Sequence, residues 1–232
     1  MASADLLDKN PSQIGKMFDT VAPKYDLLNR LISFNGDVRT RHKLIDLAQI
    51  KSGEKVCDLA CGTGDLSILM AHKGAKVLGI DLSEQMLAYA KLKSQKLNVE
   101  FKQQNILEIK EQNQFDVVTI AYGIRNLPSY QDGLKVMHQI LKPGGRVFIL
   151  EFSHPQNSLL KFFSSLYINN IAPFLSSIIN PKAKFAYEYL PQSIQSFPDA
   201  ETLKTLMMQA GFKEVKYQTL NLGMIAIHDG IK

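Results

Sequence analysis

The sequence predicts an α/β fold in which a mostly parallel sheet carries helices on both of its faces. Short apolar runs, rich in β-branched residues and bounded by Gly, Asp or Pro, are typical of buried strands. Such runs cover residues 56–60, 76–80, 99–103, 115–121 and 146–150. Stretches with helical spacing separate them, and alternating strands and helices form βαβ units. Right-handed crossovers then place helices on both faces of the sheet.

Capping residues mark the helices of this alternating region. Residues 66–73 follow the first strand as a helix. Ser83 is placed to cap the helix after the second strand, because a Ser side chain accepts a hydrogen bond from the free backbone amides there. Ser129, with Asp132 three residues later, caps a helix that ends before Pro143.

The ends of the chain lie outside the alternation, and we expect a single domain, residues 1–232, in four parts. Residues 1–50 hold helices, the first of which Pro23 divides, and the second covers residues 38–50. Residues 51–155 form the alternating core, and residues 156–191 an apolar, aromatic-rich helical insertion. Residues 192–232 carry a helix capped by Asp199 and a terminal hairpin.

Composition excludes several classes of protein. The chain has 232 residues, 45% hydrophobic and 21% charged, which suffices for one large core. The net charge of +5 is too small and too scattered to indicate nucleic acid binding. Cys57 and Cys61 are too close for a useful disulfide and too few for a zinc site. No apolar run reaches the ~18 residues of a membrane span, and the acidic N-terminus is unlike a signal peptide, so we expect a cytoplasmic protein.

The first strand leads into a glycine-rich turn that predicts a nucleotide-like ligand. Gly62, Thr63 and Gly64 lie where a parallel sheet binds ligands, at the carboxyl end of a strand. A dinucleotide motif needs a third glycine where Ser67 stands, and no phosphate-binding lysine follows. Asp58 and Asp65 flank the turn with negative charge. That charge would repel pyrophosphate and suits a cationic sulfonium ligand with an amino-acid tail.

Two further strand ends complete the predicted site. Asp81 ends the second strand, where a carboxylate accepts hydrogen bonds from both ribose hydroxyls; capping of the next helix is the alternative. Asn105 and Ile106 follow the third strand, where the amide would bind adenine and Ile106 would pack on its face. The alternative for Asn105 is a turn-forming role.

These motifs, with residues 141–145, resemble class I S-adenosylmethionine-dependent methyltransferases, whose fold is a Rossmann-like seven-stranded sheet. The outer motifs resemble one family, the ubiquinone/menaquinone biosynthesis C-methyltransferases, over most of the chain. They are residues 24–29, 32–34, 122–127, 150–153, 187–190, 193–194 and 197–199. The chain departs from the family pattern at residues 35–39, which lack the usual His and Trp, and at Ala121, where many members have Ser or Gly beside the cofactor.

The resemblance implies C-methylation of a polyprenyl quinol with S-adenosyl-L-methionine: demethylmenaquinol or, in some members, a methoxy-benzoquinol. Arg125 is then placed to stabilise the quinolate oxygen, directly or through water; the alternative is pairing with a nearby acid. Asn126 orients the ring or caps its loop, and Tyr25 covers the cofactor, contacts the quinol or packs in the core. His154 is the one histidine to consider as a base, although a loop histidine often has no function.

Residues 159–179 of the insertion are the expected contact for a prenyl tail, and the lysines of the insertion are expected to face lipid headgroups at the inner membrane surface. The insertion includes Phe162, Phe163, Leu166, Phe174 and three lysines, Lys161, Lys182 and Lys184. An ordinary buried insertion or a homodimer face explains the same residues. The alternative functions are O- or N-methylation of another small molecule, an NAD-binding oxidoreductase, and a non-catalytic binding module.

Overall fold

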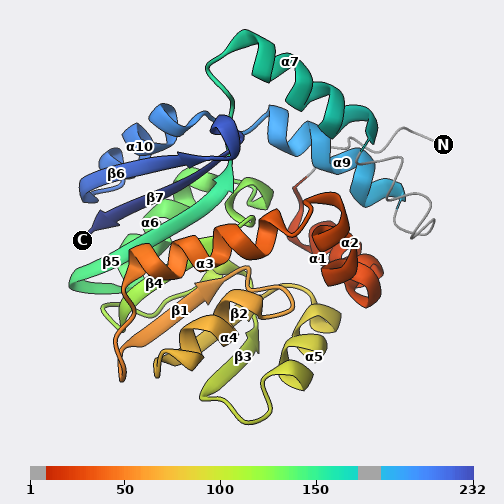
Figure 1. The fold of residues 1–232 in the computed structure, drawn as a ribbon. Coiled ribbons are helices and arrows are strands. Elements are labelled where there is room, and N and C mark those ends of the chain that lie inside the picture. Colours follow the sequence, from red (N-terminus) through yellow and green to blue (C-terminus); the bar gives the residue numbers. More distant parts are fainter. Residues whose placement is uncertain (1–8, 172–183) are drawn as a thin grey trace.

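The computed structural model describes residues 9–171 and 184–232, which form one seven-stranded sheet between two layers of helices (Figure 1). The strand order is β3-β2-β1-β4-β5-β7-β6. Strands β1 to β5 are parallel, and β7 runs antiparallel to both of its neighbours. Their bounds are β1 Lys55–Leu59, β2 Lys76–Asp81, β3 Val99–Gln103, β4 Phe115–Ala121, β5 Leu141–Phe152, β6 Lys213–Leu220 and β7 Ile225–Ile231. The predicted α/β fold with a mostly parallel sheet is confirmed.

Helices cover both faces of this sheet, as expected. The helices α3 (Gly36–Ala48) and α4 (Asp65–His72) bury apolar side chains against one face, and α5 (Glu84–Lys93) lies beside α4 (Figure 1). The helices α6 (Tyr130–Ile140) and α10 (Ala200–Gln209) pack on the other face. Alternate strand residues divide between the two layers: Val56 and Val117 face α3 and α4, whereas Cys57 and Val118 face α6 and α10.

The three predicted helix caps are confirmed. Ser83 accepts a hydrogen bond from the amide of Met86, and Ser129 accepts one from Asp132. Asp199 accepts one from the amide of Thr202. Each cap satisfies a backbone donor that the first turn of a helix leaves free.

Strand β5 begins at Leu141, five residues before the expected start at residue 146. Its extension is held at Leu141 by pairing with Phe115 of β4 and beyond it by the end of the chain. The amide of Gly144 donates to the carbonyl of Lys232, and the amide of Lys232 donates to the carbonyl of Gly145. The predicted terminal hairpin is confirmed, and β7 inserts between β5 and β6.

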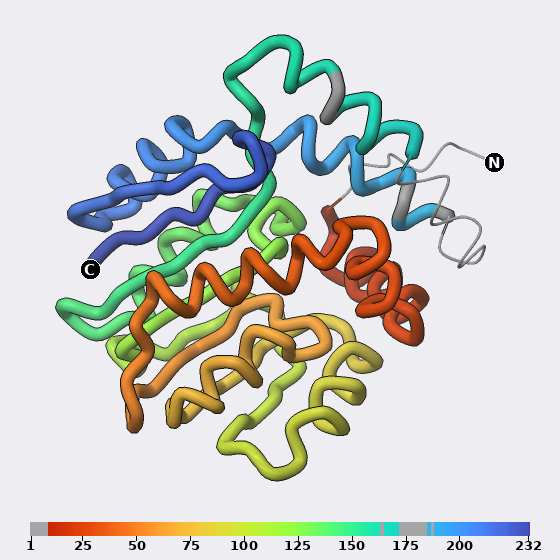
Figure 2. Tube along the Cα trace, in the orientation of Figure 1, coloured from red at the N-terminus to blue at the C-terminus, as the bar shows by residue number. Residues whose placement is uncertain are grey.

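The N-terminal helices and the insertion meet at the carboxyl ends of the parallel strands (Figure 1). Pro23 divides the first helical segment into α1 (Pro11–Val21), a 3₁₀ turn (Ala22–Lys24) and α2 (Tyr25–Ile32), as predicted. The described insertion comprises α7 (Ser158–Leu166), a π-helix (Tyr167–Ile171) and α9 (Lys184–Gln195); Phe174 and Lys182 lie outside the described residues. In Figure 2, α1 and α9 lie side by side although they are far apart in sequence, and Ile14 and Met17 pack against Tyr189.

Within residues 9–171 and 184–232, none of the helices is both long and apolar enough to cross a membrane.

Candidate functional site

Two neighbouring cavities lie at the carboxyl ends of the parallel strands. The first, of about 60 Å³, is bordered by Gly62, Asp81, Ile106 and Ala121, which follow or end four adjacent strands. The second has a volume of about 450 Å³ and lies among α2, α3, the insertion and the turn before β7. Tyr25 and Tyr122 line both cavities and therefore form the boundary between them.

The glycine turn and Asp81 form the polar side of the first cavity. Gly62 has a positive φ of 55°, and a Cβ atom placed on it would meet nothing within 4 Å, so its outer side is open. The Gly62 amide donates to Asp81 Oδ2 at 2.8 Å, and the Ser83 amide donates to Oδ1 at 2.9 Å. Both Asp81 oxygens keep lone pairs for hydroxyl donors. Burial raises the pKa of Asp81, against the effect of these hydrogen bonds.

The predicted site residues Asp58, Thr63 and Gly64 belong to the glycine turn or the strand before it and do not border the cavity. Thr63 donates a 2.6 Å hydrogen bond to Asp26. Gly64 has φ 79°, and a Cβ atom on it would lie 3.0 Å from Ala90 Cβ and 3.1 Å from the Phe101 ring. The turn therefore needs glycine at this position for packing against α5 and β3.

The negative charge expected at the turn is largely compensated. Asp65 forms ion pairs with Arg30 at 3.1 Å and with Lys93 at 2.5 Å. Asp58 is buried and accepts hydrogen bonds from Ser67 at 2.6 Å and Thr119 at 2.7 Å. The carboxylate that faces the cavity is thus Asp81, and the sequence argument from Asp58 and Asp65 overstated the local field.

Asp58 should make stability depend on pH. Burial raises its pKa to about 6, although Ser67 and Thr119 oppose the shift. The folded carboxyl therefore binds its proton more tightly than the unfolded one, and stability falls as pH rises from about 4 to about 6. Relative to Asp58→Asn, we expect the wild-type protein to lose about 3 kcal/mol of unfolding free energy between about pH 4 and pH 7. Urea unfolding of both proteins across this range measures it; parallel pH curves would contradict the assignment.

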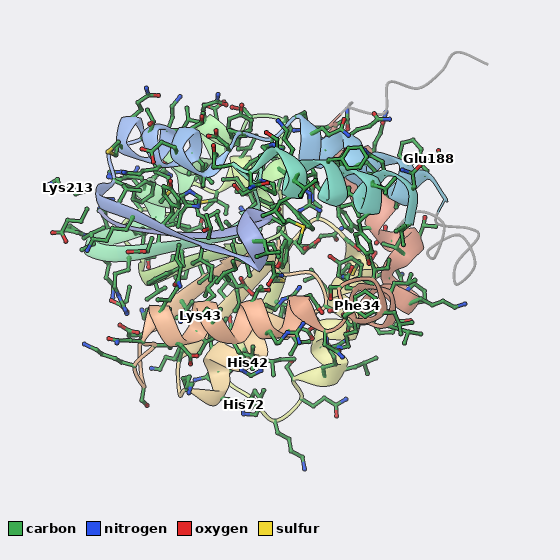
Figure 3. All side chains as sticks on the ribbon, turned by 45° about the horizontal axis from the view of Figure 1, so that its top comes forward. Phe34, His42, Lys43, His72, Glu188 and Lys213 are labelled. Carbon is green, nitrogen blue, oxygen red and sulfur yellow. The ribbon has the colours of Figure 1, made fainter. Side chains whose placement is uncertain are left out.

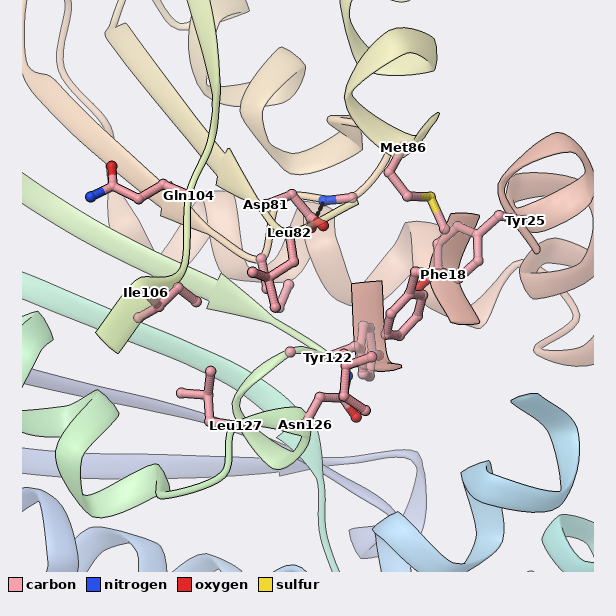
Figure 4. A pocket seen from close by; sticks show the side chains of 15 residues that line it. Phe18, Tyr25, Asp81, Leu82, Met86, Gln104, Ile106, Tyr122, Asn126 and Leu127 are labelled. Carbon is pink, nitrogen blue, oxygen red and sulfur yellow. Dashed lines mark hydrogen bonds between the residues drawn. The ribbon is translucent and has the colours of Figure 1, made fainter. Parts of the chain in front are cut away.

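Asn105, the expected adenine contact, does not border the first cavity. Its Oδ1 accepts from the amide of Leu107 and caps the 3₁₀ turn Ile106–Glu108, and its Nδ2 donates to Glu108. This is the turn-forming alternative. Gln104 borders the cavity instead, with its amide pointing away from Asp81 in Figure 4. Its buried Oε1 has no hydrogen-bond partner among the described residues.

Aromatic and aliphatic side chains from the N-terminal helices and α5 cover the first cavity (Figure 4). Phe18 and Tyr25 form an edge-to-face pair with ring centroids 6.2 Å apart, next to Met86 and Leu82. An open glycine turn, a hydroxyl-accepting carboxylate and apolar walls fit a nucleoside. Because ligand pockets usually measure ~300–1,000 Å³, a nucleoside enters only if the covering side chains move.

The second cavity has mostly apolar walls and two guanidinium groups. Its apolar lining includes Ile32, Phe152, Leu160, Ile168, Leu190, Ile194, Met224 and Ile225. Arg125 and Arg41 also line it, and both are at least nine-tenths buried. Such a cavity suits an apolar molecule with a small number of polar atoms.

Arg125 follows β4 in the 3₁₀ turn Ile124–Asn126 and pairs with a buried acid. Its Nη1 donates to Glu151 at 2.8 Å and to the Tyr122 carbonyl at 2.6 Å. Burial raises the pKa of Glu151, which the Arg125 charge opposes. The sequence alternative, pairing with an acid, is therefore present, yet Arg125 Nε is buried without a partner among the described residues. This atom is also closed to the cavity, so a ligand reaches it only if neighbouring side chains move.

Arg41 and Asp37 form a second buried ion pair that the sequence did not reveal. Arg41 Nη1 lies 2.9 Å from Asp37 Oδ2, and the guanidinium lies 5.5 Å from the ring centroid of Tyr122. Thr40 binds the Tyr122 hydroxyl at 2.8 Å. Helix α3 begins at Gly36, two residues earlier than expected, and this start places Asp37 one helical turn before Arg41.

The other residues considered for catalysis differ in which cavity they border. Tyr25 borders both, and burial raises its pKa against the nearby charges of Arg41 and Arg125. Asn126 borders the first cavity and accepts a hydrogen bond from Tyr189. His154 borders neither, and its ring hydrogen-bonds to the carbonyl of Phe197.

Comparisons with known proteins agree on one family. The sequence model of the ubiE/COQ5 methyltransferase family matches residues 6–232. A demethylmenaquinone methyltransferase of Thermus thermophilus is 41% identical over 92% of this chain and 99% of its own length. A ubiquinone/menaquinone biosynthesis C-methyltransferase UbiE of Shewanella is 38% identical over 97% of this chain and 92% of that protein.

Solved structures resemble the chain in fold. An S-adenosylmethionine-dependent methyltransferase of Thermotoga maritima, described as a possible histamine N-methyltransferase, superposes with a TM-score of 0.66 over 94% of this chain and 99% of that one, at 19% identity. The phosphoethanolamine N-methyltransferase 2 of Haemonchus contortus, solved with S-adenosyl-L-methionine, gives 0.62 over 82% and 52%, at 16% identity. The fold is thus the Rossmann-like methyltransferase fold that the sequence predicted.

Proposed function

The chain belongs to the ubiE/COQ5 methyltransferase family, and from this premise we propose that it methylates a ring carbon of demethylmenaquinol with S-adenosyl-L-methionine as the methyl donor. Curated relatives named demethylmenaquinone methyltransferase at 38–41% identity support the naphthoquinol. The observation that carries the proposal is the pair of adjoining cavities. One is bordered by groups that suit a nucleoside once its covering side chains move, and the other suits a large apolar molecule with polar ring atoms.

The first cavity is the proposed donor site. Gly62 would lie against the amino-acid tail, Asp81 would accept the ribose hydroxyls, and Ile106 would pack on the adenine. S-adenosyl-L-methionine bound there supplies an electrophilic methyl group on a sulfonium. Tyr25 and Tyr122 stand on the boundary that the methyl group must cross.

The second cavity is the proposed quinol site. A quinol ring carbon becomes nucleophilic when a neighbouring hydroxyl ionises, because the quinolate oxygen donates electron density to it. The guanidinium of Arg125, which lines this cavity, would stabilise that oxygen, because a fixed cationic donor has its largest effect where water is excluded. The apolar walls then hold the start of the prenyl tail.

Methyl transfer from labelled S-adenosyl-L-methionine to reduced demethylmenaquinol and to a methoxy-benzoquinol, each with two prenyl units, tests the substrate. We expect label on the naphthoquinol ring carbon and slower labelling of the benzoquinol. Label on neither quinol would overturn the proposal. Calorimetry with S-adenosyl-L-methionine and with NAD tests the donor separately, and binding of NAD alone would exclude a methyltransferase.

We also propose that the mouth of the second cavity rests on a lipid leaflet. Phe34 and Leu222 line the cavity, yet each is 72% exposed, so they lie at its opening (Figure 3 shows Phe34). Leu159 and Phe162 of α7 are exposed as well. An apolar rim around an apolar cavity lets a prenyl tail leave the leaflet without crossing water.

The double variant Phe34→Ser/Leu222→Ser should float poorly with phosphatidylglycerol–phosphatidylethanolamine vesicles, because it removes two apolar side chains from the contact. Leu92→Ser is the matched control, since Leu92 is 64% exposed on α5 and borders neither cavity. Equal flotation of the double variant and the wild-type protein would exclude this face as the membrane contact.

A further inference from the structure

The quinol site described above contains a carboxylate of its own. Among the described residues that line the second cavity, Asp37 is the one acidic residue. It is buried, with 8% of its surface exposed. Its Oδ1 accepts a 2.9 Å hydrogen bond from Ser33 and its Oδ2 one of 2.9 Å from Arg41. A carboxylate offers about four acceptor positions, so Asp37 keeps capacity for a further proton.

Methylation of a ring carbon requires a proton acceptor. As the new carbon–carbon bond forms, the sulfonium loses the methyl group with its bonding pair taken up by sulfur, and the ring carbon carries both the methyl group and its hydrogen. The carbon–hydrogen bond must then break, and its electron pair returns to the ring. Because this step restores aromaticity, a weak base such as an ion-paired carboxylate is strong enough.

We propose that Asp37 is the catalytic base that removes this ring proton; the proposal rests on the quinol being the substrate. The proton passes from the ring carbon to Asp37 and from there to the product oxygen or to solvent. Arg41 is a positioning residue whose guanidinium holds the Asp37 carboxylate in place. The two residues act as one unit at the start of α3.

The position of Asp37 and Arg41 supports a role in catalysis, because this ion pair lies next to the boundary between the two cavities. Arg41 lies over the ring of Tyr122, and Thr40 binds the Tyr122 hydroxyl. Tyr122 lines both cavities, so the reacting ring carbon must come close to it. Asp37 therefore lies within the same group of contacts as the point of methyl transfer.

Other candidate bases described in the structure are less suitable. Glu151 is 1% exposed, does not line either cavity and binds Arg125 and the amide of Phe152. Burial raises the pKa of Tyr122 to about 12, so its hydroxyl stays protonated at neutral pH. His154 lines neither cavity.

The test uses Asp37→Asn, which keeps the shape and one acceptor oxygen, with reduced demethylmenaquinol carrying hydrogen or deuterium at the methyl-accepting carbon. We expect kcat to fall by ~10²–10⁴-fold, the usual contribution of a positioned base. A primary deuterium isotope effect should appear in the variant, because proton removal becomes rate-limiting. Asp37→Glu restores a carboxylate and should recover part of kcat. Asp46→Asn, the same change on the exposed side of α3, should behave as wild type.

Calorimetry of S-adenosyl-L-methionine and quinol binding and the thermal midpoint complete the test. With Asp37 as the base, both dissociation constants stay within about threefold of wild type. The thermal midpoint should fall in either case, because Asp37→Asn leaves Arg41 buried without its ion-pair partner. A purely structural role would weaken quinol binding, or lower kcat without an isotope effect, and this result would overturn the assignment. If the wild-type protein does not methylate demethylmenaquinol, the proposed function fails, whereas an active wild type with a fast Asp37→Asn variant rejects this inference alone.

Discussion

Replacing Arg125 by Met should lower kcat by ~10²–10³-fold, the usual loss when one donor to a developing oxyanion is removed. The Met side chain has similar length, so the cavity wall stays filled while the guanidinium donors and the charge disappear. Affinity for S-adenosyl-L-methionine should change little, because Arg125 does not border the first cavity. Steady-state kinetics with reduced demethylmenaquinol and donor calorimetry measure the two effects.

The same substitution leaves Glu151 without its ion-pair partner, and this second effect needs its own control. Removing one partner of a buried ion pair costs about 3–5 kcal/mol, because the other charge stays buried without compensation. Arg125→Met/Glu151→Gln removes both charges and should recover most of the stability in urea unfolding. Its turnover should stay as low as that of Arg125→Met. Near-wild-type turnover of this stable double variant would mean that Arg125 serves the fold alone.

The sequence predicted the fold because local signals and topology rules agree along most of the chain. Buried strands, caps at Ser83, Ser129 and Asp199, and right-handed crossovers needed no long-range information. The early start of β5 was missed because it depends on pairing with Phe115 of β4 and with Lys232, both of them distant in the sequence. A Pro-Gly-Gly segment indicates a turn unless such a partner is known.

The contrast between local signals and long-range contacts also explains which site residues could be predicted. Gly62, Asp81, Ile106 and Ala121 were predicted to lie together because the carboxyl ends of adjacent parallel strands meet at one edge. Side-chain partners from other elements were not predictable. The ion pair between Asp65 and Lys93 links α4 to α5. The hydrogen bond between Thr40 and Tyr122 joins residues that are 82 positions apart. Asp37 was left outside the predicted helix, so its pairing with Arg41 had no local signal.

The second large effect is expected at Asp81. Asp81→Asn should weaken S-adenosyl-L-methionine binding by ~10–100-fold, because hydrogen bonds to a charged group are worth about 1.5–3 kcal/mol. The NH2 group of Asn would also face one of the Gly62 and Ser83 amides, each of which now donates to a different carboxylate oxygen. Asp19→Asn is a matched control: Asp19 binds Ser83 and Gln85 at the same helix start but does not border the cavity. The affinity of Asp19→Asn for S-adenosyl-L-methionine should change little.

The pH dependence of binding distinguishes ribose recognition from helix capping at Asp81. Burial raises the pKa of Asp81, so on acidification it gains a proton at higher pH than an ordinary carboxyl. A protonated acid cannot accept from two hydroxyls through two charged oxygens, and donor affinity of the wild-type protein should therefore fall as the pH is lowered. Asp81→Asn carries no such proton and should show a flat profile at its weaker affinity. If Asp81 only joined the turn to α5, the variant would lose stability, and its donor affinity would keep the pH dependence of the wild type.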